Sequence, residues 1–476
     1  MTPRAALAAL MALPLVACVA GPAPEIATPV PELPARFFHD PQAQEEGLGV
    51  LLPAGDPAYD ALAAQALAQS PDLGQALARV EAARAGAARA GAERSPSISA
   101  DTSVTGVRTN PNQIGSSLPG GIAFDTERLT YSANLTARWD ADLFGRIKAQ
   151  ERAANARLDA AEWEAHGVRV ALLSEIAGSV IDWRSLTARE AALRQDLAAA
   201  ESLAALAASR EEAGLAPGFD RVRAQAAASA SNSRLAALGG ERARLIGRLV
   251  TLTALDGDGV ALALALPTKA DGLPSPARAL PSSLLQNRPD VLAAMAQLQA
   301  ADADLAAAAR QRFPRLTLSA ALGLLSFNLS SLFESDSLVG SLGAGLAAPL
   351  FDFGRIEAEI DGAAASKKAA FAAYRGAVFA ALGEAEAAYG LVAASDTEAA
   401  AATEENAQLE HAASLADTRF RAGLADFLTV LEARRAADAS GERAAASLGR
   451  ARRARVLLWQ ALGGSVDQPT NRSISQ

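Results

Sequence analysis

WDADLFGRIKA, residues 139–149, decides the fold of this chain, because its centre occurs twice. Phe144-Gly145-Arg146-Ile147 returns unchanged as Phe353-Gly354-Arg355-Ile356, 209 positions later, within PLFDFGRIEAE at residues 349–359. Glycine permits backbone conformations that other residues avoid, so each copy is suited to a bend. If the chain contains one unit built twice, residues on either side should repeat at a similar spacing.

The flanking residues do repeat. Downstream, Ala213-Gly214-Leu215-Ala216 returns at the same offset as Ala422-Gly423-Leu424-Ala425. Upstream the offset becomes 218, because Pro71-Asp72 returns as Pro289-Asp290. The change of nine falls beside a longer loop in the first copy, residues 110–125. A register that holds over long stretches and shifts once, in a loop, predicts an internal duplication.

Each repeat begins with an alanine-rich helical segment and two strand-like runs. In RLTYSANLTARWD, residues 128–140, apolar and polar side chains alternate, which predicts a strand with one apolar and one polar face. The other strand-like runs begin at Ser97, Leu316 and Leu338. Their lengths suit a tilted membrane strand of about 9–11 residues, although a half-buried sheet of a soluble domain would alternate in the same way.

Tyr131 and Trp139 lie near opposite ends of the apolar face of one predicted strand. Tyrosine and tryptophan concentrate at membrane–water interfaces, so both are candidates for interfacial positions. Trp139 would also suit packing where the strand meets the helix. Strands matter here because no stretch after the N-terminus approaches the roughly 20 uninterrupted apolar residues of a membrane-spanning helix.

A long helix is predicted after the strands of each repeat. Residues 146–213 and 355–422 are 68 residues each and lack proline. At 1.5 Å per residue each would span about 100 Å. The strand–helix junctions fall at Gly145-Arg146 and Gly354-Arg355, and the far hairpin tips at Gly214-Leu215 and Gly423-Leu424. Glycine is common at such helix ends for conformational reasons alone.

The N-terminus reads as a targeting signal, residues 1–17, with Arg4 before a short apolar run. The run ends in Leu15-Val16-Ala17-Cys18, which resembles a bacterial lipobox, and Cys18 is the chain's single cysteine. An ordinary signal peptide with a chance cysteine is the alternative. A lipidated Cys18 followed by Val19 favours the outer membrane, and several acyl chains give durable anchoring.

Composition excludes several functions. The net charge of −9 and pI near 5.2 argue against nucleic acid, which requires a basic face. His39, His166 and His411 are isolated, without metal-ligand spacing or a nucleophile motif, so we expect neither an enzyme nor a cofactor. A lipid-anchored coiled-coil scaffold without a pore remains an alternative, although a scaffold has no need of the alternating strands.

Four strands cannot close a barrel, and lipid does not tolerate unpaired strand edges. The smallest outer-membrane barrels have about eight strands. Several chains must therefore contribute strands to one barrel if the protein spans the membrane. The residues predict an oligomer and leave the number of subunits open.

The chain resembles the outer-membrane efflux factors of the TolC family, in the lipoprotein branch that serves RND-type multidrug pumps. The resemblance covers nearly the whole mature chain. It implies an α+β membrane protein in which three chains build a 12-stranded barrel in the outer membrane, continuous with a helical tunnel in the periplasm. Its most specific stretches are LPSSLLQNRPDV (280–291), WDADLFGRI (139–147), RFPRLTLSA (312–320), RFRAGLADFLTVLEARRA (419–436) and WQALGG (459–464).

The resemblance also implies partners and a passive function. The homotrimer would be the exit duct for drugs, joined to an inner-membrane RND-type pump through a periplasmic adaptor, with adaptor contacts at Gly214, Leu215, Gly423 and Leu424. A type I protein secretion duct shares the fold and is the alternative. The implied organisation is a signal peptide (1–17), a lipidated extended segment (18–70), repeat 1 (71–255), a linker (256–287), repeat 2 (288–464) and a tail (465–476).

Leu428, Glu432 and Arg435 form the candidate periplasmic gate. Their spacing places an apolar side chain and an opposite-charge pair on one helical face, just past the second tip. The family has its closed gate at matching positions. An exposed ion pair of little energetic consequence is the alternative. The first repeat carries Phe219, Arg223 and Ala226 at the corresponding positions, so the set is not a product of duplication.

Overall fold

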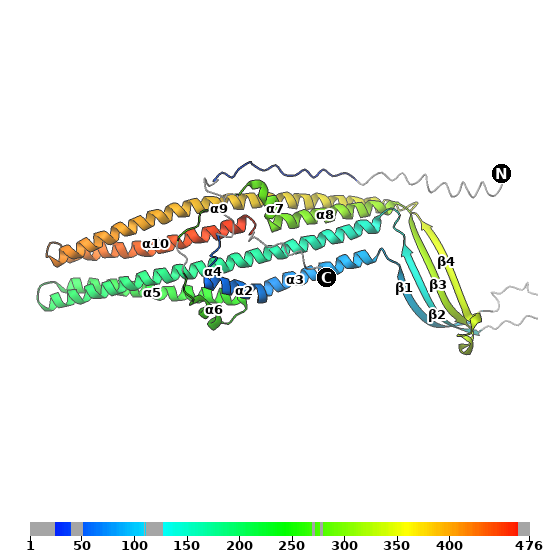
Figure 1. Ribbon diagram of the computed structural model, residues 1–476, viewed down its shortest axis with the longest axis horizontal. Helices are drawn as coiled ribbons and strands as arrows, with labels where there is room; N and C mark the ends of the chain where they lie inside the picture. Colours follow the sequence, from blue (N-terminus) through cyan, green and yellow to red (C-terminus); the bar gives the residue numbers. More distant parts are fainter. Residues whose placement is uncertain are drawn as a thin grey trace, which may run out of the picture. The chain divides into compact units, whose positions relative to one another are not determined.

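The computed structural model describes residues 24–39, 51–108, 110, 127–268, 272–276 and 279–464. Cys18, nearly all of the loop 110–125 and the tail 465–476 therefore lie outside the described residues. Within them, both repeats show the expected order of one helix, two strands and two further helices (Figure 1). The α+β class and the duplication are confirmed.

The element boundaries agree closely with the sequence periodicity. The two long helices have 67 residues each and end one residue earlier than expected. Repeat 1 contains α3 (Pro71–Ala92), β1 (Ser97–Arg108), β2 (Glu127–Asp140), α4 (Arg146–Glu212) and α5 (Gly218–Thr253). Repeat 2 contains α8 (Pro289–Ala309), β3 (Arg315–Ser326), β4 (Leu338–Ala347), α9 (Arg355–Arg421) and α10 (Phe427–Ala461).

One expectation was wrong for the segment before the first repeat. Residues 18–70 were expected to be extended, but Pro57–Gln69 forms α2. The local signals are clear: Asp56 caps the helix by accepting from Ala58 N, and Pro57 occupies the first turn. The linker also contains a helix, α6 (Gly257–Leu264), which Asp256 caps by accepting from Gly259 N.

The four strands form one antiparallel sheet in the order β1-β2-β3-β4. The repeats are joined by the β2–β3 ladder, in which Trp139 pairs with Leu318 and Leu135 with Leu322. β1 and β4 are the two edges, and each pairs with one neighbour within the chain.

The predicted alternation produces two chemically different sheet faces. On one face, hydroxyl groups pair across the β1–β2 ladder, with 2.8 Å between Ser99 Oγ and Thr136 Oγ1 and 2.8 Å between Ser103 Oγ and Ser132 Oγ. On the other face lie Ile98, Leu135 and their apolar neighbours in the register. All residues of β1 are exposed and those of β2 are exposed or half-buried, so the described residues bury neither face of this ladder.

The compact units of the chain do not coincide with the repeats. One unit combines residues 81–160 with 295–372, and the other combines 161–294 with the chain from 373 onward. Each unit therefore draws on both repeats. The first includes a core of Leu305, Ile356 and Ile360, onto which Ile26 packs, and the second includes Leu186, Leu193 and Leu238.

α9 carries an unexpectedly apolar stretch. An 18-residue window has a mean hydropathy of 1.3, so by length and composition alone this helix among the described ones could cross a membrane. The sequence search missed it because the window is interrupted rather than uniformly apolar. Only 33% of the window is buried within the chain. Alanine on several sides of a helix produces this property, because small apolar side chains face more than one direction.

Candidate functional site

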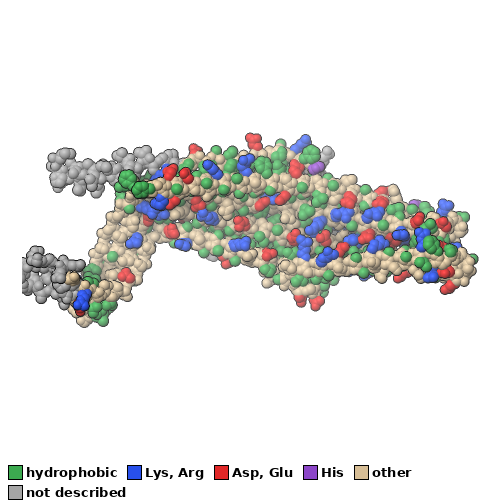
Figure 2. Space-filling model, turned by 180° about the vertical axis from the view of Figure 1, so that it is seen from behind, with side chains coloured by type: hydrophobic (Ala, Val, Ile, Leu, Met, Phe, Trp, Pro, Cys, Tyr) green, Lys and Arg blue, Asp and Glu red, His purple; other side chains and the backbone are tan. Residues whose placement is uncertain are grey.

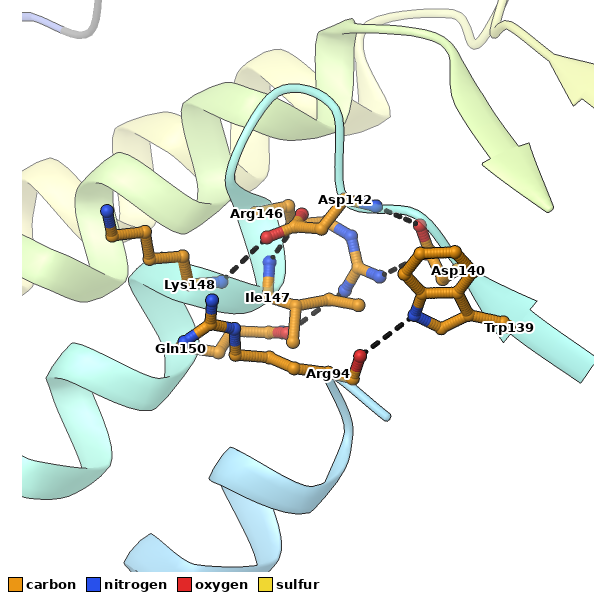
Figure 3. A network of polar contacts seen from close by, with 8 residues as sticks. All are labelled: Arg94, Trp139, Asp140, Asp142, Arg146, Ile147, Lys148 and Gln150. Carbon is orange, nitrogen blue, oxygen red and sulfur yellow. Dashed lines mark hydrogen bonds and ion pairs between the residues drawn. The ribbon is translucent and has the colours of Figure 1, made fainter. Parts of the chain in front are cut away.

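The first strand–helix junction is a network of short polar contacts (Figure 3). The Asp142 carboxylate accepts from Ile147 N and Lys148 N, at 2.9 Å each, and so caps α4. Arg146 binds Asp140 at 3.0 Å, and Trp139 Nε1 donates to Arg94 O at 2.8 Å. The indole N–H of Trp139 thus binds the backbone two residues after α3, while the side chain stays partly exposed, which fits both interpretations given for this residue.

The second junction performs the same turn with different residues. Asp352 caps α9 by accepting from Ile356 N at 2.8 Å and Gly354 N at 3.2 Å. Both Gly145 and Gly354 have positive φ, 75° and 88°. The backbone conformation therefore favours glycine at these positions. α4 and α9 begin at Arg146 and Arg355, as placed from the motif.

The hairpin tips share one turn geometry. Gly214 and Gly423 have φ of 68° and 72°. Leu215 N donates to Arg210 O, and Leu424 N donates to Arg419 O, each at 2.8 Å. These bonds reach back five residues, as in a Schellman motif. The following leucine usually packs back on its helix in this motif, but Leu215 and Leu424 are 72% and 69% exposed.

An apolar cluster lies just behind the exposed tip leucines and joins the two hairpins. Its buried members come from all four long helices, and the Arg210 guanidinium lies 4.9 Å from the centre of the Phe420 ring. Each tip therefore exposes a leucine side chain, and the buried cluster packs behind it. The buried members are Leu203, Ala207, Ala224, Ala416, Phe420, Phe427, Val430 and Leu431.

The candidate gate residues lie on the solvent-exposed face of α10 in the single chain. Glu432 and Arg435 are exposed, and Leu428 is partly exposed at 37%. Among the ion pairs of the described residues, none joins Glu432 to Arg435. Asp426 caps this helix by accepting from Thr429 N at 2.8 Å, which fixes the start of the gate segment. The three side chains thus remain available to groups outside the chain.

Sequence reasoning missed an ion-pair network between the hairpins. Arg189 of α4 binds Glu241 of α5 at 3.2 Å and Glu442 of α10 at 2.8 Å. Arg453 of α10 binds Asp182 of α4 at 3.1 Å. All of these side chains except that of Glu442 line an open cavity of about 450 Å³ between the three helices. Charged residues recurring on alanine-rich helices were the available signal, but sequence does not pair them across hairpins.

Charged side chains are interspersed along the helices and are sparse on the sheet in the view of Figure 2.

Two buried arginines, Arg288 and Arg455, bind groups that lie far from them in the sequence. Arg288 donates to Ala461 O at 2.9 Å and to Glu384 at 2.7 Å. Arg455 binds Asp396 and Pro274 O. Within the described residues there is no group of three or more His, Cys, Asp or Glu placed to hold a metal ion.

Comparison with known proteins gives consistent matches. The model of the family described as outer membrane efflux protein matches residues 62–257 and 280–464. The pyoverdine export outer membrane protein OpmQ of Pseudomonas aeruginosa is 34% identical over 413 residues, 86% of each chain. The toluene efflux pump outer membrane protein TtgF of Pseudomonas putida is 30% identical, over 88% of this chain and 86% of that protein. The solved outer-membrane channel OprN superposes with a TM-score of 0.81 at 27% identity, over 93% of this chain and 99% of that one.

Proposed function

This chain belongs to the outer membrane efflux protein family, and from that membership we propose that it forms the passive exit duct of a tripartite efflux system. A pump in the inner membrane and a periplasmic adaptor pass small toxic compounds to the duct, which releases them outside the cell. Two similar proteins are named for pyoverdine export and toluene efflux, which favours small molecules over secreted proteins as cargo. The TolC-type efflux family expected from the sequence is confirmed.

The open sheet carries the proposal of a shared barrel. Its edges, β1 and β4, have no second partner within the described chain, and its faces differ in polarity. Unpaired strand edges are not stable in lipid, so β4 of one copy pairs with β1 of the next. Three copies supply twelve strands in a homotrimer. The hydroxyl-lined face then borders the water-filled lumen, and the face with Ile98 and Leu135 contacts lipid.

The helices carry the periplasmic functions. The exposed leucines of the tips, Leu215 and Leu424, provide apolar contacts for the adaptor, supported by the packed cluster behind them. Three copies of Leu428, Glu432 and Arg435 constrict the duct around its axis. Their exposure, and the lack of an ion pair between Glu432 and Arg435 within the described residues, support contacts between copies. The transport requires no covalent chemistry, no metal and no cofactor.

The N-terminus anchors the duct to the membrane by lipid attached to Cys18. The protein acts in the outer membrane and extends into the periplasm. Labelling cells with a radioactive fatty acid tests the anchor, because the label should enter the wild-type protein and be absent after Cys18→Ala. Label in both proteins would disprove lipidation at this cysteine.

The duct itself is tested in a deletion strain and in planar bilayers. Loss of the gene should increase susceptibility to toxic compounds, and the purified trimer should conduct ions. Unchanged susceptibility together with a defect in protein secretion would replace the efflux proposal with the secretion alternative. Absence of conductance from a heat-modifiable trimer would contradict a pore altogether.

A further inference from the structure

Two buried aspartates face each other across the contact between the two hairpins. Asp196 lies on α4 and Asp438 on α10, and each residue is 5% exposed. The two stretches lie opposite each other, since Arg189, seven residues before Asp196, binds Glu442, four residues after Asp438, at 2.8 Å. A hydrogen bond between two carboxyl groups requires a proton, because ionised carboxylates can only accept.

Each aspartate has one buried oxygen without a hydrogen-bond partner among the described residues. Asp196 Oδ2 and Asp438 Oδ1 are buried and have no conventional hydrogen-bond partner. Burying even one unpaired carboxylate is costly, and two like charges at close range add to the cost. A single shared proton removes one charge and supplies the missing donor. The proton belongs to the pair rather than to either residue.

The charged neighbours do not replace that proton. On α10, Arg434 is 3.6 Å from Asp438 but is also 3.7 Å from Glu410 of α9, and its buried Nε has no hydrogen-bond partner. Arg234 of α5 is 3.7 Å from Glu442 of α10 and donates to Ser231. Glu442 is also held by Arg189 of α4. The two nearest arginines are thus divided among several carboxylates.

Burial is the largest influence on the pair, and it raises the pKa of Asp196 to about 7, helped by the hydrogen bond and charge of Asp438. Burial likewise raises the pKa of Asp438, while its bond to Asp196 and the charges of Arg434 and Arg234 oppose the rise. The pair therefore holds its proton in acid and loses it near neutrality.

The position of the pair links it to the candidate gate. Asp438 is three residues after Arg435 on α10 and seven after Leu431, which is buried in the cluster behind the tips. Residues seven apart lie on the same side of a helix, so Asp438 continues the buried face of Leu431, whereas Arg435, about one turn earlier, is exposed. Moving α10 away from α4 at the pair would move the gate residues with it.

We propose that Asp196 and Asp438 form a proton-controlled latch between the two hairpins. The shared proton holds α10 against α4, and its loss leaves two facing carboxylates that repel and release α10, which widens the periplasmic aperture. This inference rests on the proposed duct function and adds its regulation. An acid with a raised pKa stabilises the latched state fully below its ordinary value of 3.8, and this stabilisation is lost as pH rises through about 7.

Single-channel recording in planar bilayers tests the latch with the full-length trimer. Between about pH 5 and about pH 7 the ratio of released to latched channels should change by up to about tenfold per pH unit in the wild type. Asp196→Asn keeps the shape and a donor toward Asp438 but cannot ionise, so its conductance should stay low across the range. Asp417→Asn, at a half-buried α9 carboxylate paired with Arg421, should behave as the wild type.

A wild-type pH response in Asp196→Asn and in Asp438→Asn would overturn the latch. A heat-modifiable trimer that conducts at no pH in any variant would instead contradict the duct. Infrared spectroscopy gives a readout that does not depend on conduction. The carbonyl band of a protonated carboxyl group should be present in the wild type at about pH 6 and disappear above neutrality, and should be missing from Asp196→Asn. A band unaffected by both substitutions would show that the proton lies elsewhere.

Discussion

At the scale of single residues, the two strand–helix junctions show that duplication preserved the bend but not the residues that make it. The repeated glycines both have positive φ, while the second strained residue differs, Asp142 with φ 44° in one copy and Phe353 with φ 55° in the other. The capping aspartates also differ, because Asp142 lies three residues before its glycine and Asp352 two. Several local solutions thus satisfy one requirement, to end a strand and start a helix.

The tip glycines allow a residue-scale prediction. Gly214 has φ 68° and no heavy atom near a hypothetical Cβ, so Gly214→Ala introduces backbone strain without a clash. We expect destabilisation of about 1–2 kcal/mol. Gly240→Ala is the matched control, since Gly240 is helical in α5 with equally open space, and should stabilise by about 0.5–1 kcal/mol. Thermal unfolding followed by circular dichroism measures both, and equal effects would contradict the turn geometry.

At the scale of elements, the helices combine weak individual amphipathicity with specific polar links. Alanine buries little area per residue, so an alanine contact contributes less than a leucine contact. Buried arginines fix the elements that alanine alone would position poorly. Arg184 of α4 reaches the start of α2 through Asp56. It also donates to two carbonyls at the end of α6 and just after it, Leu264 O at 3.1 Å and Leu266 O at 2.7 Å.

The link between α2 and α4 has a defined pH dependence. Burial acts to raise the pKa of Asp56, but the hydrogen bonds from Arg184 and Ala58 and the Arg184 charge outweigh it, so the pKa is lowered. A lowered pKa contributes stability above the ordinary value of 3.8 that is lost as pH falls through the folded value. Breaking this buried pair by Asp56→Asn should cost about 3–5 kcal/mol near neutrality. Unfolding midpoints measured from neutral pH to below about pH 4 should converge for the two proteins, and a constant difference would contradict this assignment.

At the scale of the whole molecule, the exposed groups of the single chain point to contacts between copies. The sheet has two free edges, and the candidate gate residues have no ion pair with each other within the described part of α10. An isolated chain leaves strand edges that lipid does not tolerate. Assembly of several copies therefore pairs the strand edges of the barrel, and we propose that it also brings the gate residues of neighbouring copies together.

The gate is tested by changing its charges. Glu432→Ala combined with Arg435→Ala should increase single-channel conductance, because both groups are expected to constrict the duct and tie neighbouring copies together. Arg223→Ala is the matched control, since Arg223 occupies the position of Glu432 in the first repeat and contacts the Phe219 ring of its own helix. Unchanged conductance in the double variant, with normal trimers, would remove these residues from the gate.

The sequence by itself determined the elements and their duplication. Period-two alternation, proline-free helical stretches and repeated glycines are local properties, so they predicted β2, α4, α9 and the tips to within a residue or two. It did not predict α2. The alanine periodicity there is too weak to distinguish a helix from an extended segment, and the capping bond of Asp56 is seen only in the structure. The glycines of the strand–helix junctions and of the hairpin tips could also be predicted, because a positive φ is a property of the local backbone.

Only the tertiary structure decided which distant charges meet. Asp196 and Asp438 are 242 positions apart, and nothing in either local sequence pairs them. The same holds for Arg189 with Glu442 and for Arg184 with Asp56. The physical reason is that a helix fixes which residues share its face, whereas the rotation and register of two packed helices depend on the whole interface between them.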